Sequence, residues 1–328
     1  EIVLGDIDLE LANRVKDKIK SDKITTVKVD ASKVEDIKNA AKGVDVVINL
    51  TLVQFNANVM QAAVESGANY VDTALDYSLM AQLRKRQLPE ISNVFKKAGL
   101  TALIGCGGIP GVDHVLVKYA CDKLDRVESI SIKTSGEISQ KPRDIISAWN
   151  PGWSPKIAIT DLTLEPVVFE NGEYKRYPIF SGREEYDFGP LGKVLVKYHH
   201  HEEVHMLSNF IGKGLKYVEY KNALDVKAGC LVKLGLGSDK PIDVKGVKVA
   251  PLDVLLKLVP SPSNAFFTED EAVKQPFDSR RICAIKVKGA KSGEDVEYNM
   301  SFDYNLFTST EERLEVYKKF GTINIYVA

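Results

Sequence analysis

The sequence contains few of the features that mark secreted, membrane-spanning or nucleic-acid-binding proteins. Its four cysteines lie at positions 106, 121, 230 and 283 and form no CxxC pair, which indicates a reduced, cytoplasmic protein. No apolar run approaches the roughly 20 residues that span a bilayer, and no signal peptide is visible. Because the formal net charge is only −1, nothing points to a nucleic-acid or acidic-membrane partner.

The composition is that of an ordinary globular protein. The 328 residues are 44% hydrophobic and 27% charged, which is enough apolar material for two domains or one large one. The sequence changes character near residue 125, where strands alternating with helices give way to mostly strands. We therefore predict a first domain over residues 1–124 and a second that begins at residue 125.

Apolar strand-like runs alternate with helix-like segments through the first domain. Such alternation is typical of βαβ units in a parallel sheet, whose strands are buried on both faces. The expected strands are Ile2–Leu4, Thr25–Val29, Val44–Leu50, Tyr70–Val71 and Leu100–Ile104. The expected helices are Leu9–Lys20, Val34–Ala41, Ala57–Ser66 and Leu79–Lys97. Glycines suited to a left-handed helix end follow three of these helices, namely Gly43, Gly67 and Gly99.

The second domain shows period-two alternation, which is typical of antiparallel strands with one solvated face. DRVESISIKTSGE (125–137) is such a run, and Lys193–Tyr198 is another. A tight hairpin is expected around Asn171-Gly172, and a long one in residues 281–304 with its turn near Ser292-Gly293. Helices are expected at Leu252–Leu258 and, weakened by two glycines, at Ala228–Leu236. The pattern predicts an α+β domain with an antiparallel sheet.

The opening residues EIVLGDID predict a short buried strand that ends in an acid. In a dinucleotide-binding domain, an acidic residue at the end of the second strand binds the ribose hydroxyls. Asp6 fits that position, which would make Ile2–Leu4 the second strand and leave the first strand and its Gly-rich loop, roughly 25–30 residues, before residue 1. The alternative is a helix-capping role, which Asp8 fits better than Asp6. A carboxylate repels a 2′-phosphate, so NAD is favoured over NADP.

Other candidate ligands stand at the ends of the following strands, where such sheets bind their ligands. Asp30 and Ala31 in KVDAS (28–32) would lie beside the adenine, although Asp30 or Ser32 could instead cap the next helix. NLT (49–51) would pass the nicotinamide ribose, and VDTA (71–74) ends another strand.

The segment LIGCGGIPGVDHVLVKYA (103–120) is the most specific in the chain. With its strand, Gly-rich turn, Pro110-Gly111 and helix, it resembles the saccharopine dehydrogenase-like family, which includes saccharopine reductases and lysine 6-dehydrogenases. LGDID, VDAS, WSP (153–155) and the strand into HHHEEVHML (199–207) match other parts of the family pattern. FGTINIYVA resembles the start of the family's C-terminal return, so residues 125–310 would be the substrate domain and 311–328 the return to the first domain.

The resemblance implies a Rossmann-type doubly wound parallel sheet, lacking here its first strand and Gly-rich loop, with a second α+β domain that contains an antiparallel sheet. It also implies site residues. Those lining the cofactor would be Asp6, Asp30, Ala31, Leu50, Thr51, Thr73, Ala74 and Pro110, with Thr73 facing the substrate as well. Those binding the substrate would be Ile109, Trp153, Ser154 and Glu202, and the catalytic candidates would be Asp72, Asp113, His114 and His201.

The chain also departs from the family pattern. Saccharopine reductases carry an acid just before the Pro-Gly pair, where this chain has Ile109, and their arginines near the third strand have no obvious match apart from Arg183. These departures make saccharopine itself a less favoured substrate, and they favour lysine or another amino acid. The resemblance thus implies NAD(P)-dependent hydride transfer at the C–N carbon of an amino acid, as in lysine 6-dehydrogenase, by a homodimer that binds its substrate between the domains.

Oxidation of an amine carbon needs a base to neutralise the amine and a cation to hold the substrate carboxylate. His114 and His201 are the candidate bases because imidazole titrates near neutral pH, with a histidine satisfied in the first helical turn as the alternative for His114. Lys156 or Arg183 would hold the carboxylate, although Lys156 also fits a solvated surface charge.

Two further hypotheses remain at this stage. HEEVH (201–205) has the HExxH spacing of zinc hydrolases, with His201 and His205 as ligands and Glu202 as base. The alternation of KVLVKYHH predicts a strand there, and histidines four residues apart on a strand lie about 13 Å apart and cannot share one ion. We therefore expect no metal. The third hypothesis is a sensor that retains the dinucleotide fold without catalysis.

Overall fold

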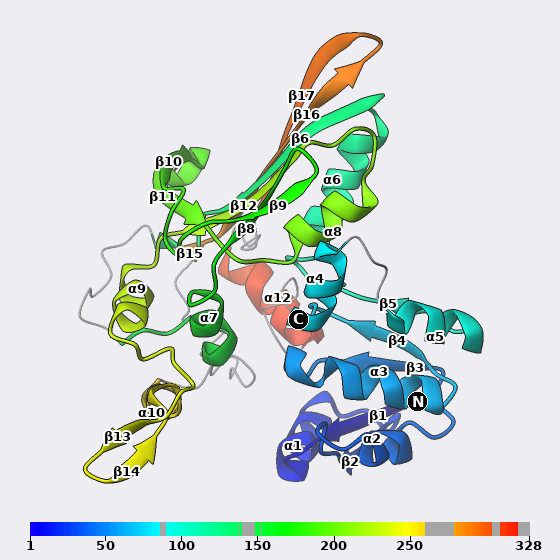
Figure 1. Ribbon diagram of the computed structural model, residues 1–328. Coiled ribbons are helices and arrows are strands. Elements are labelled where there is room, and N and C mark those ends of the chain that lie inside the picture. Colours follow the sequence, from blue (N-terminus) through cyan, green and yellow to red (C-terminus); the bar gives the residue numbers. More distant parts are fainter. Residues whose placement is uncertain are drawn as a thin grey trace. The chain divides into compact units, whose positions relative to one another are not determined.

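The computed structural model describes residues 1–85, 90–136, 138–139, 148–151, 153–259, 279–303 and 309–320 (Figure 1). The chain divides into two compact units, and the division falls inside helix α6, between Val115 and Leu116. No helix in these described ranges is both long and apolar enough to cross a membrane.

The first unit alternates strands and helices, as predicted. Its strands are β1 (Ile2–Asp6), β2 (Ile24–Lys28), β3 (Val46–Asn49), β4 (Asn69–Asp72) and β5 (Ala102–Leu103). Its helices are α1 (Leu9–Ile19), α2 (Val34–Ala40), the short η1 (Val53–Phe55), α3 (Asn56–Glu65), α4 (Tyr77–Arg84) and α5 (Glu90–Ala98), and the start of α6 (Val112–Asp122) follows.

The strand pairs in the described part of the first unit are all parallel. β1 pairs with β2, and β3, β4 and β5 form a second sheet in that order. This confirms the predicted α/β architecture with parallel strands. One expected helix, Leu79–Lys97, is wrong, because the structure has two separate helices, α4 and α5.

The second unit is rich in strands. They are β6 (Arg126–Thr134), β7 (Ile138–Ser139), β8 (Val167–Glu170), β9 (Glu173–Arg176), β10 (Glu184–Asp187), β11 (Lys193–Tyr198), β12 (Tyr217–Ala223), β13 (Ile242–Val244), β14 (Val247–Val249), β15 (Ser279–Arg280), β16 (Ile282–Lys291) and β17 (Glu294–Asp303). The helices are α7 (Pro155–Asp161), η2 (Gly189–Leu191), α8 (Glu203–Phe210), α9 (Val226–Lys233), α10 (Pro251–Leu258) and α12 (Thr310–Phe320).

Among the described residues, the main sheet of this unit has eight strands and is mixed. Its central path is β10-β11-β12-β6-β16-β17, with β8 pairing to β12 and β9 to β8. The hairpins at Asn171-Gly172 and Ser292-Gly293 and the strand Lys193–Tyr198 confirm the predictions. The expectation of an antiparallel sheet is wrong in one respect, because β6 and β12 run parallel. Such a pair joins strands far apart in the chain, so no hairpin signal announces it.

The two faces of the main sheet differ in chemistry. On β6, Ile130 and Ile132 are fully buried and alternate with Ser131 and Lys133. Lys133 Nζ lies 2.8 Å from the carboxylate of Glu219 on β12, and Ser131 Oγ donates to the same carboxylate at 2.7 Å. One face therefore packs in the core, while the other carries a largely buried ionic network.

A buried polar network joins the ends of β3 and β4 to the loop after β5. Asp72, the last residue of β4, is 1% exposed, and its Oδ1 accepts from the Gly105 backbone N–H at 2.7 Å. Its Oδ2 accepts from the Tyr70 hydroxyl at 2.9 Å and the Asn56 amide at 3.3 Å. Asn49 completes the network by donating to Tyr70 and Asn56. Burial raises the pKa of Asp72 to about 6, against the opposing effect of these hydrogen bonds.

The raised pKa of Asp72 predicts a pH-dependent stability. The folded protein binds this proton more tightly than the unfolded chain, so the free energy of unfolding should fall as the pH rises from about 4 to about 6. Asp72→Asn should reduce this slope, because an amide does not ionise. Urea unfolding followed across this pH range measures it. Asp17→Asn, a change at an exposed residue of α1, is the control, and equal slopes in Asp72→Asn and the unchanged protein would contradict the assignment.

Candidate active site

The C-terminal end of β1 carries two acids with different tasks. Asp8 accepts from the Leu11 N–H at 3.0 Å and caps α1, as expected. Asp6 lies just before it, half-buried, and its Oδ1 accepts from the Asp8 N–H at 2.8 Å. Oδ2 of Asp6 has no hydrogen-bond partner in the described part of the chain. Asp6 thus presents a carboxylate oxygen at the end of a parallel strand, where such sheets bind ligands.

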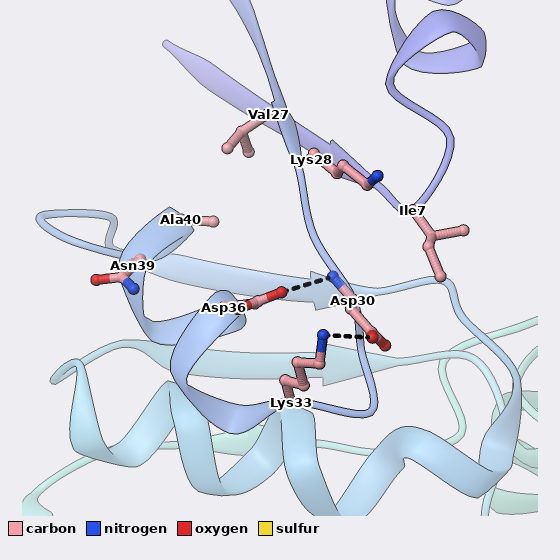
Figure 2. Close-up of a pocket in the computed structure, with 8 residues that line it drawn as sticks. All are labelled: Ile7, Val27, Lys28, Asp30, Lys33, Asp36, Asn39 and Ala40. Atoms are coloured by element: carbon pink, nitrogen blue, oxygen red, sulfur yellow. Dashed lines mark hydrogen bonds and ion pairs between the residues drawn. The ribbon is translucent and has the colours of Figure 1, made fainter.

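A cavity of about 480 Å³ lies next to this strand end (Figure 2). It is lined by Ile7, Val27, Lys28, Asp30, Lys33, Asp36, Asn39 and Ala40. Its volume is in the range of sites that bind small molecules. The structure therefore places Asp30, a predicted cofactor ligand, in a cavity wall.

Asp30 shapes the turn beside this cavity. Its Oδ1 accepts from the Ser32 hydroxyl at 2.6 Å and the Ser32 backbone N–H at 3.0 Å, and these bonds lower its pKa. Lys33 Nζ lies 3.3 Å from Oδ2. The alternative prediction that Asp30 or Ser32 caps the next helix is wrong, since α2 begins after Lys33 with no side-chain cap. The carbonyl of Ala31 accepts from Asn58 of α3, which anchors the turn.

The other predicted strand-end residues have varied surroundings. Thr51 donates from both its backbone N and its hydroxyl to Asn49 Oδ1, whereas the Leu50 side chain is 71% exposed. The Ala74 carbonyl accepts from Asn56 at 2.8 Å. Thr73 lies beside Gly107, where an added Cβ would stand 2.9 Å from the Thr73 carbonyl oxygen. Asp72 has both carboxylate oxygens bound by neighbouring protein groups, so the structure gives it a positioning role.

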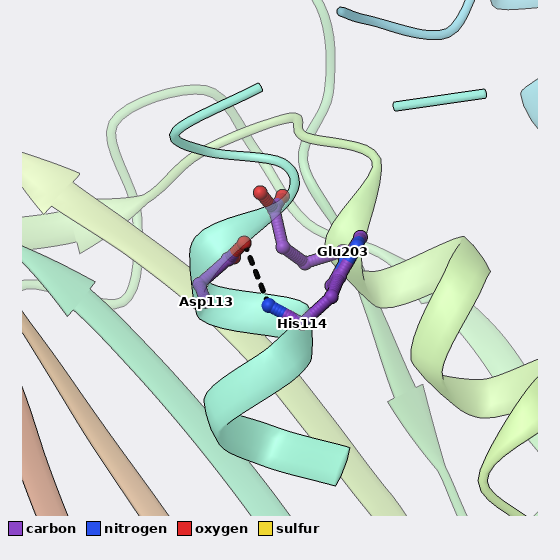
Figure 3. Close-up of side chains that lie close together, drawn as sticks. All are labelled: Asp113, His114 and Glu203. Carbon is purple, nitrogen blue, oxygen red and sulfur yellow. Dashed lines mark hydrogen bonds between the residues drawn. The ribbon is translucent and has the colours of Figure 1, made fainter. Parts of the chain in front are cut away.

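The Gly-rich segment after β5 turns tightly into α6. An added Cβ at Gly111 would lie 1.9 Å from the Gly107 carbonyl oxygen, so only glycine fits at this close approach. Ile109 and Pro110 lie within this turn. Asp113 then opens α6, and its Oδ1 accepts from the backbone N–H groups of Gly111 and His114, each at 2.8 Å (Figure 3). Asp113 is fully buried.

In the second unit, a cluster of ionisable residues lies between β11 and α8. His201 Nδ1 hydrogen-bonds to the Glu203 carboxylate and lies 3.3 Å from Glu202 Oε2. One ring nitrogen of His201 and one carboxylate oxygen from each of Glu202 and Glu203 all lie within 4.8 Å of one another. The imidazole stacks on the Tyr220 ring, with 4.3 Å between centroids and 18° between planes. Tyr220 belongs to the neighbouring strand β12, so the cluster packs against the sheet through this ring.

The carboxylates keep a proton on His201. Burial lowers its pKa, but the charges of Glu203 and Glu202 outweigh this, and the pKa rises to about 10. Asp161, at the end of α7, acts in the same direction. At neutral pH His201 is therefore an imidazolium, which donates protons, whereas the sequence suggested a base.

The local structure around HEEVH differs from the strand that the sequence predicted. β11 ends at Tyr198, and α8 begins at Glu203, whose negative charge suits a helix N-terminus. His205 lies on this helix and packs near Tyr174 and His200, with ring centroids 5.5 and 6.0 Å away. In the described ranges, His201 converges with Glu202 and Glu203 but not with His205. The HExxH arrangement is therefore not formed.

The remaining predicted substrate residues lie elsewhere in the second unit. Ser154 caps α7, accepting from the Ile157 N–H at 3.4 Å, and Trp153 before it is 40% exposed. Arg183 Nε donates to the Phe180 carbonyl at 2.9 Å. Sequence reasoning missed four members of the buried cluster: Asp161, Lys197, Glu203 and Tyr220. Only the position of Glu203, two residues after His201 and at a helix start, offered a signal.

Sequence comparison identifies both units. Residues 1–103 match the family model of the saccharopine dehydrogenase NADP binding domain, and residues 107–278 match that of the saccharopine dehydrogenase C-terminal domain. The chain is 27% identical over 275 residues to the carboxynorspermidine synthase of Vibrio cholerae, which is 77% of this chain and 62% of that relative. It is 24% identical over 307 residues to the carboxyaminopropylagmatine dehydrogenase of Synechocystis sp., covering 91% of this chain and 73% of the relative.

Solved structures show the same fold. Apo saccharopine dehydrogenase (L-Glu forming) from Saccharomyces cerevisiae has a TM-score of 0.60 at 13% identity, covering 100% of this chain and 93% of that one. The homospermidine synthase of Legionella pneumophila, in complex with NAD, has a TM-score of 0.54 at 15% identity, covering 92% and 77%. With both family models accounting for most of its length, the chain belongs to the saccharopine dehydrogenase-like family.

Proposed function

We propose that the protein is an NAD(P)-dependent oxidoreductase that transfers hydride between the nicotinamide and the C–N carbon of an amine substrate. Family membership supports the reaction class, and both functional units of the family are present. The chain spans 62% of the length of the Vibrio cholerae relative, so the activity is proposed for the whole protein.

The buried Glu203 carboxylate is the observation that carries this proposal. Its side chain is fully buried, one oxygen binds His201, and Oε1 has no hydrogen-bond partner among the described residues. A carboxylate oxygen removed from water is costly unless a donor meets it. A substrate ammonium group would supply that donor and a positive charge together.

The charges of the cluster lead to the same ligand. Glu202 and Glu203 place two buried carboxylates beside the His201 imidazolium. An amine substrate that binds as a cation would add positive charge beside these carboxylates.

The names of the relatives bear on the substrate. Two curated relatives are named for carboxynorspermidine and carboxyaminopropylagmatine, and the two solved structures for saccharopine and homospermidine. These names favour an amine adduct over free lysine, which the sequence resemblance placed first. We therefore propose that the substrate is a secondary amine. Its nitrogen would join two parts of the molecule, each of which carries an amine or a carboxylate. Assembly as a homodimer and a cytoplasmic location remain predictions.

The residues present in the first unit fit the adenosine end of a nicotinamide cofactor. Asp6 has an oxygen suited to accept from ribose hydroxyls, and the cavity beside Asp30 has room for a planar ring. A Gly-rich pyrophosphate loop of the G-x-G-x-x-G type does not occur in residues 1–328. The Asp6 carboxylate supports NAD over NADP, although the matching family model is named for NADP.

The protein's own residues would position the amine and move its proton. Glu203 and Glu202 would accept from the substrate amine, and the His201 imidazolium would donate a proton to the nitrogen in the reducing direction. Asp72 would fix the strand end through Gly105 and Tyr70. When bound, the nicotinamide supplies or accepts the hydride at the neighbouring carbon.

Glu203→Gln tests the amine site. The amide keeps the shape but removes the charge, so the KM for the amine should rise about 10-fold or more, as expected for a hydrogen bond to a charged group. The nicotinamide absorbance measures turnover with carboxylated polyamines, saccharopine and lysine as substrates.

The matched control for Glu203→Gln is Glu185→Gln, a change at an exposed residue of β10. NADH binding, followed by fluorescence, should be unchanged in both variants. If the intact protein turns over none of these amines, the proposed function fails. An unchanged KM in Glu203→Gln would refute only the role of Glu203.

Asp6→Ser tests the cofactor assignment. Loss of the carboxylate should weaken NADH binding about 10-fold and bring the NADPH affinity closer to that of NADH, because the repulsion of a 2′-phosphate is removed. Fluorescence titration with both cofactors measures this, with Asp8→Asn as a control at the neighbouring cap. Stronger NADH binding in Asp6→Ser would contradict the ribose role.

A further inference from the structure

A row of buried basic side chains runs along the end of β11 into the following turn. Lys197 and His199 are two residues apart and lie on the same side of the chain, with Lys197 Nζ 3.5 Å from His199 Nδ1. The rings of His199 and His201 follow, with 5.8 Å between centroids. Lys197 is 2% exposed and His199 is 8% exposed. The row ends at the imidazolium that contacts Glu203.

Lys197 differs from the other buried lysines of this unit. Lys133 and Lys221 each pair with Glu219 and Glu184 at 2.8–3.5 Å. In the described part of the chain, no carboxylate lies within ion-pair distance of Lys197, and Asp225 and Asp161 act on it only from farther away. A buried ammonium without a close counter-ion is costly. Burial accordingly lowers the pKa of Lys197 to about 8.

The contact with Lys197 fixes the state of His199. A lysine amine in its charged form only donates, so Nδ1 of His199 must accept and its proton must lie on Nε2. Burial and the charges of Lys197, His201 and His200 all hold the pKa of His199 well below its usual value. His199 is therefore a neutral imidazole beside a charged one, His201.

The cavity that Lys197 lines in the described part of the chain is too small for a substrate. This cavity has a volume of about 10 Å³ and is also lined by Asp161, Phe180 and His199. That volume is close to the minimum for one water molecule and far too small for an amine substrate. The contact with His199 is the route from Lys197 toward His201 that the described residues show.

We propose that Lys197 is a positioning residue that holds His199 as a neutral imidazole with its proton on Nε2, leaving His201 as the single imidazolium beside Glu202 and Glu203. The catalytic part of this inference rests on the proposed function, whereas the effect on the tautomer does not. For the reaction, this means that the His201 imidazolium is the one source of the proton donated to the substrate nitrogen.

Nuclear magnetic resonance of the intact protein labelled with ¹⁵N at histidine tests this directly. The chain has only five histidines, and His199→Gln identifies the signals of His199. In the unchanged protein, His199 should show the Nε2–H tautomer and stay neutral between about pH 5 and 8. Lys197→Met should give a mixture of tautomers and a His199 that titrates closer to pH ~6.5.

Two variants act as controls. Lys197→Arg keeps the charge and the donor and should preserve the tautomer, whereas Lys193→Met, at an exposed position of the same strand, should change nothing. An Nδ1–H tautomer in the unchanged protein, or an unaltered His199 in Lys197→Met, would overturn the proposal. If Lys197→Met does not fold, Lys197→Gln provides the same comparison.

A kinetic measurement separates this inference from the proposed function. With an amine that the unchanged protein turns over, Lys197→Met should lower kcat about 10-fold and shift the pH profile, while Lys193→Met should not. If Lys197→Met shifts the His199 tautomer but the unchanged protein turns over no amine, the proposed function is refuted and the role of Lys197 still stands. A tautomer shift with unaltered kcat and pH profile would overturn the catalytic part.

Discussion

The burial of the Glu203 carboxylate against the His201 imidazolium is the constraint on which the second unit's chemistry depends. Two charges taken from water attract each other strongly, but each also loses hydration that must be replaced. The protein replaces it with the Tyr220 ring, the Glu202 carboxylate and the start of α8. What results is a fixed, water-poor acidic surface, which suits an ammonium ligand better than a neutral one.

The first unit uses a buried carboxylate differently. Asp72 is as deeply buried as Glu203, but donors from Gly105, Tyr70 and Asn56 occupy both of its oxygens. It therefore ties a strand end to the Gly-rich turn through both of its oxygens. Asp72 and Glu203 thus illustrate two roles of a buried carboxylate. A carboxylate whose oxygens are both hydrogen-bonded within the protein stabilises the fold, whereas one with an oxygen that lacks a partner indicates a ligand site.

Local patterns predicted much of the fold. Asp8 at the start of α1, the glycines after three helices and the hairpin at Asn171-Gly172 each depend on a few neighbouring residues, and the structure confirms them. The parallel pairing of β6 with β12 was missed, because it depends on contacts between strands about 90 residues apart in the sequence. The helix in HEEVH was missed because the alternating run KVLVKYHH ends just before it, and periodicity alone does not mark such an end.

The candidate site was predicted less completely than the fold. Asp6, Asp30 and His201 were proposed as site residues because strand ends and a family pattern point to them, and their roles stay predictions. The protonation of His201 was not, since it depends on how close Glu203 and Glu202 lie. Lys197 was read only as part of an alternating strand, because nothing in the sequence distinguishes a buried lysine from a solvated one.

The ionic network on the main sheet acts as a lock on strand register, because it favours one alignment of β12 against β6. Ser131 stands directly opposite Glu219 in the parallel pair, and Lys133 stands opposite Lys221. A slip of β12 by two residues in one direction would keep every apolar side chain on the core side but would bring Lys221 opposite Ser131 and move Glu219 away from Lys133. The hydrophobic pattern alone does not discriminate against that slip, whereas the charges do. Because His201 stacks on Tyr220 of the same strand, this lock also sets where the acidic cluster forms.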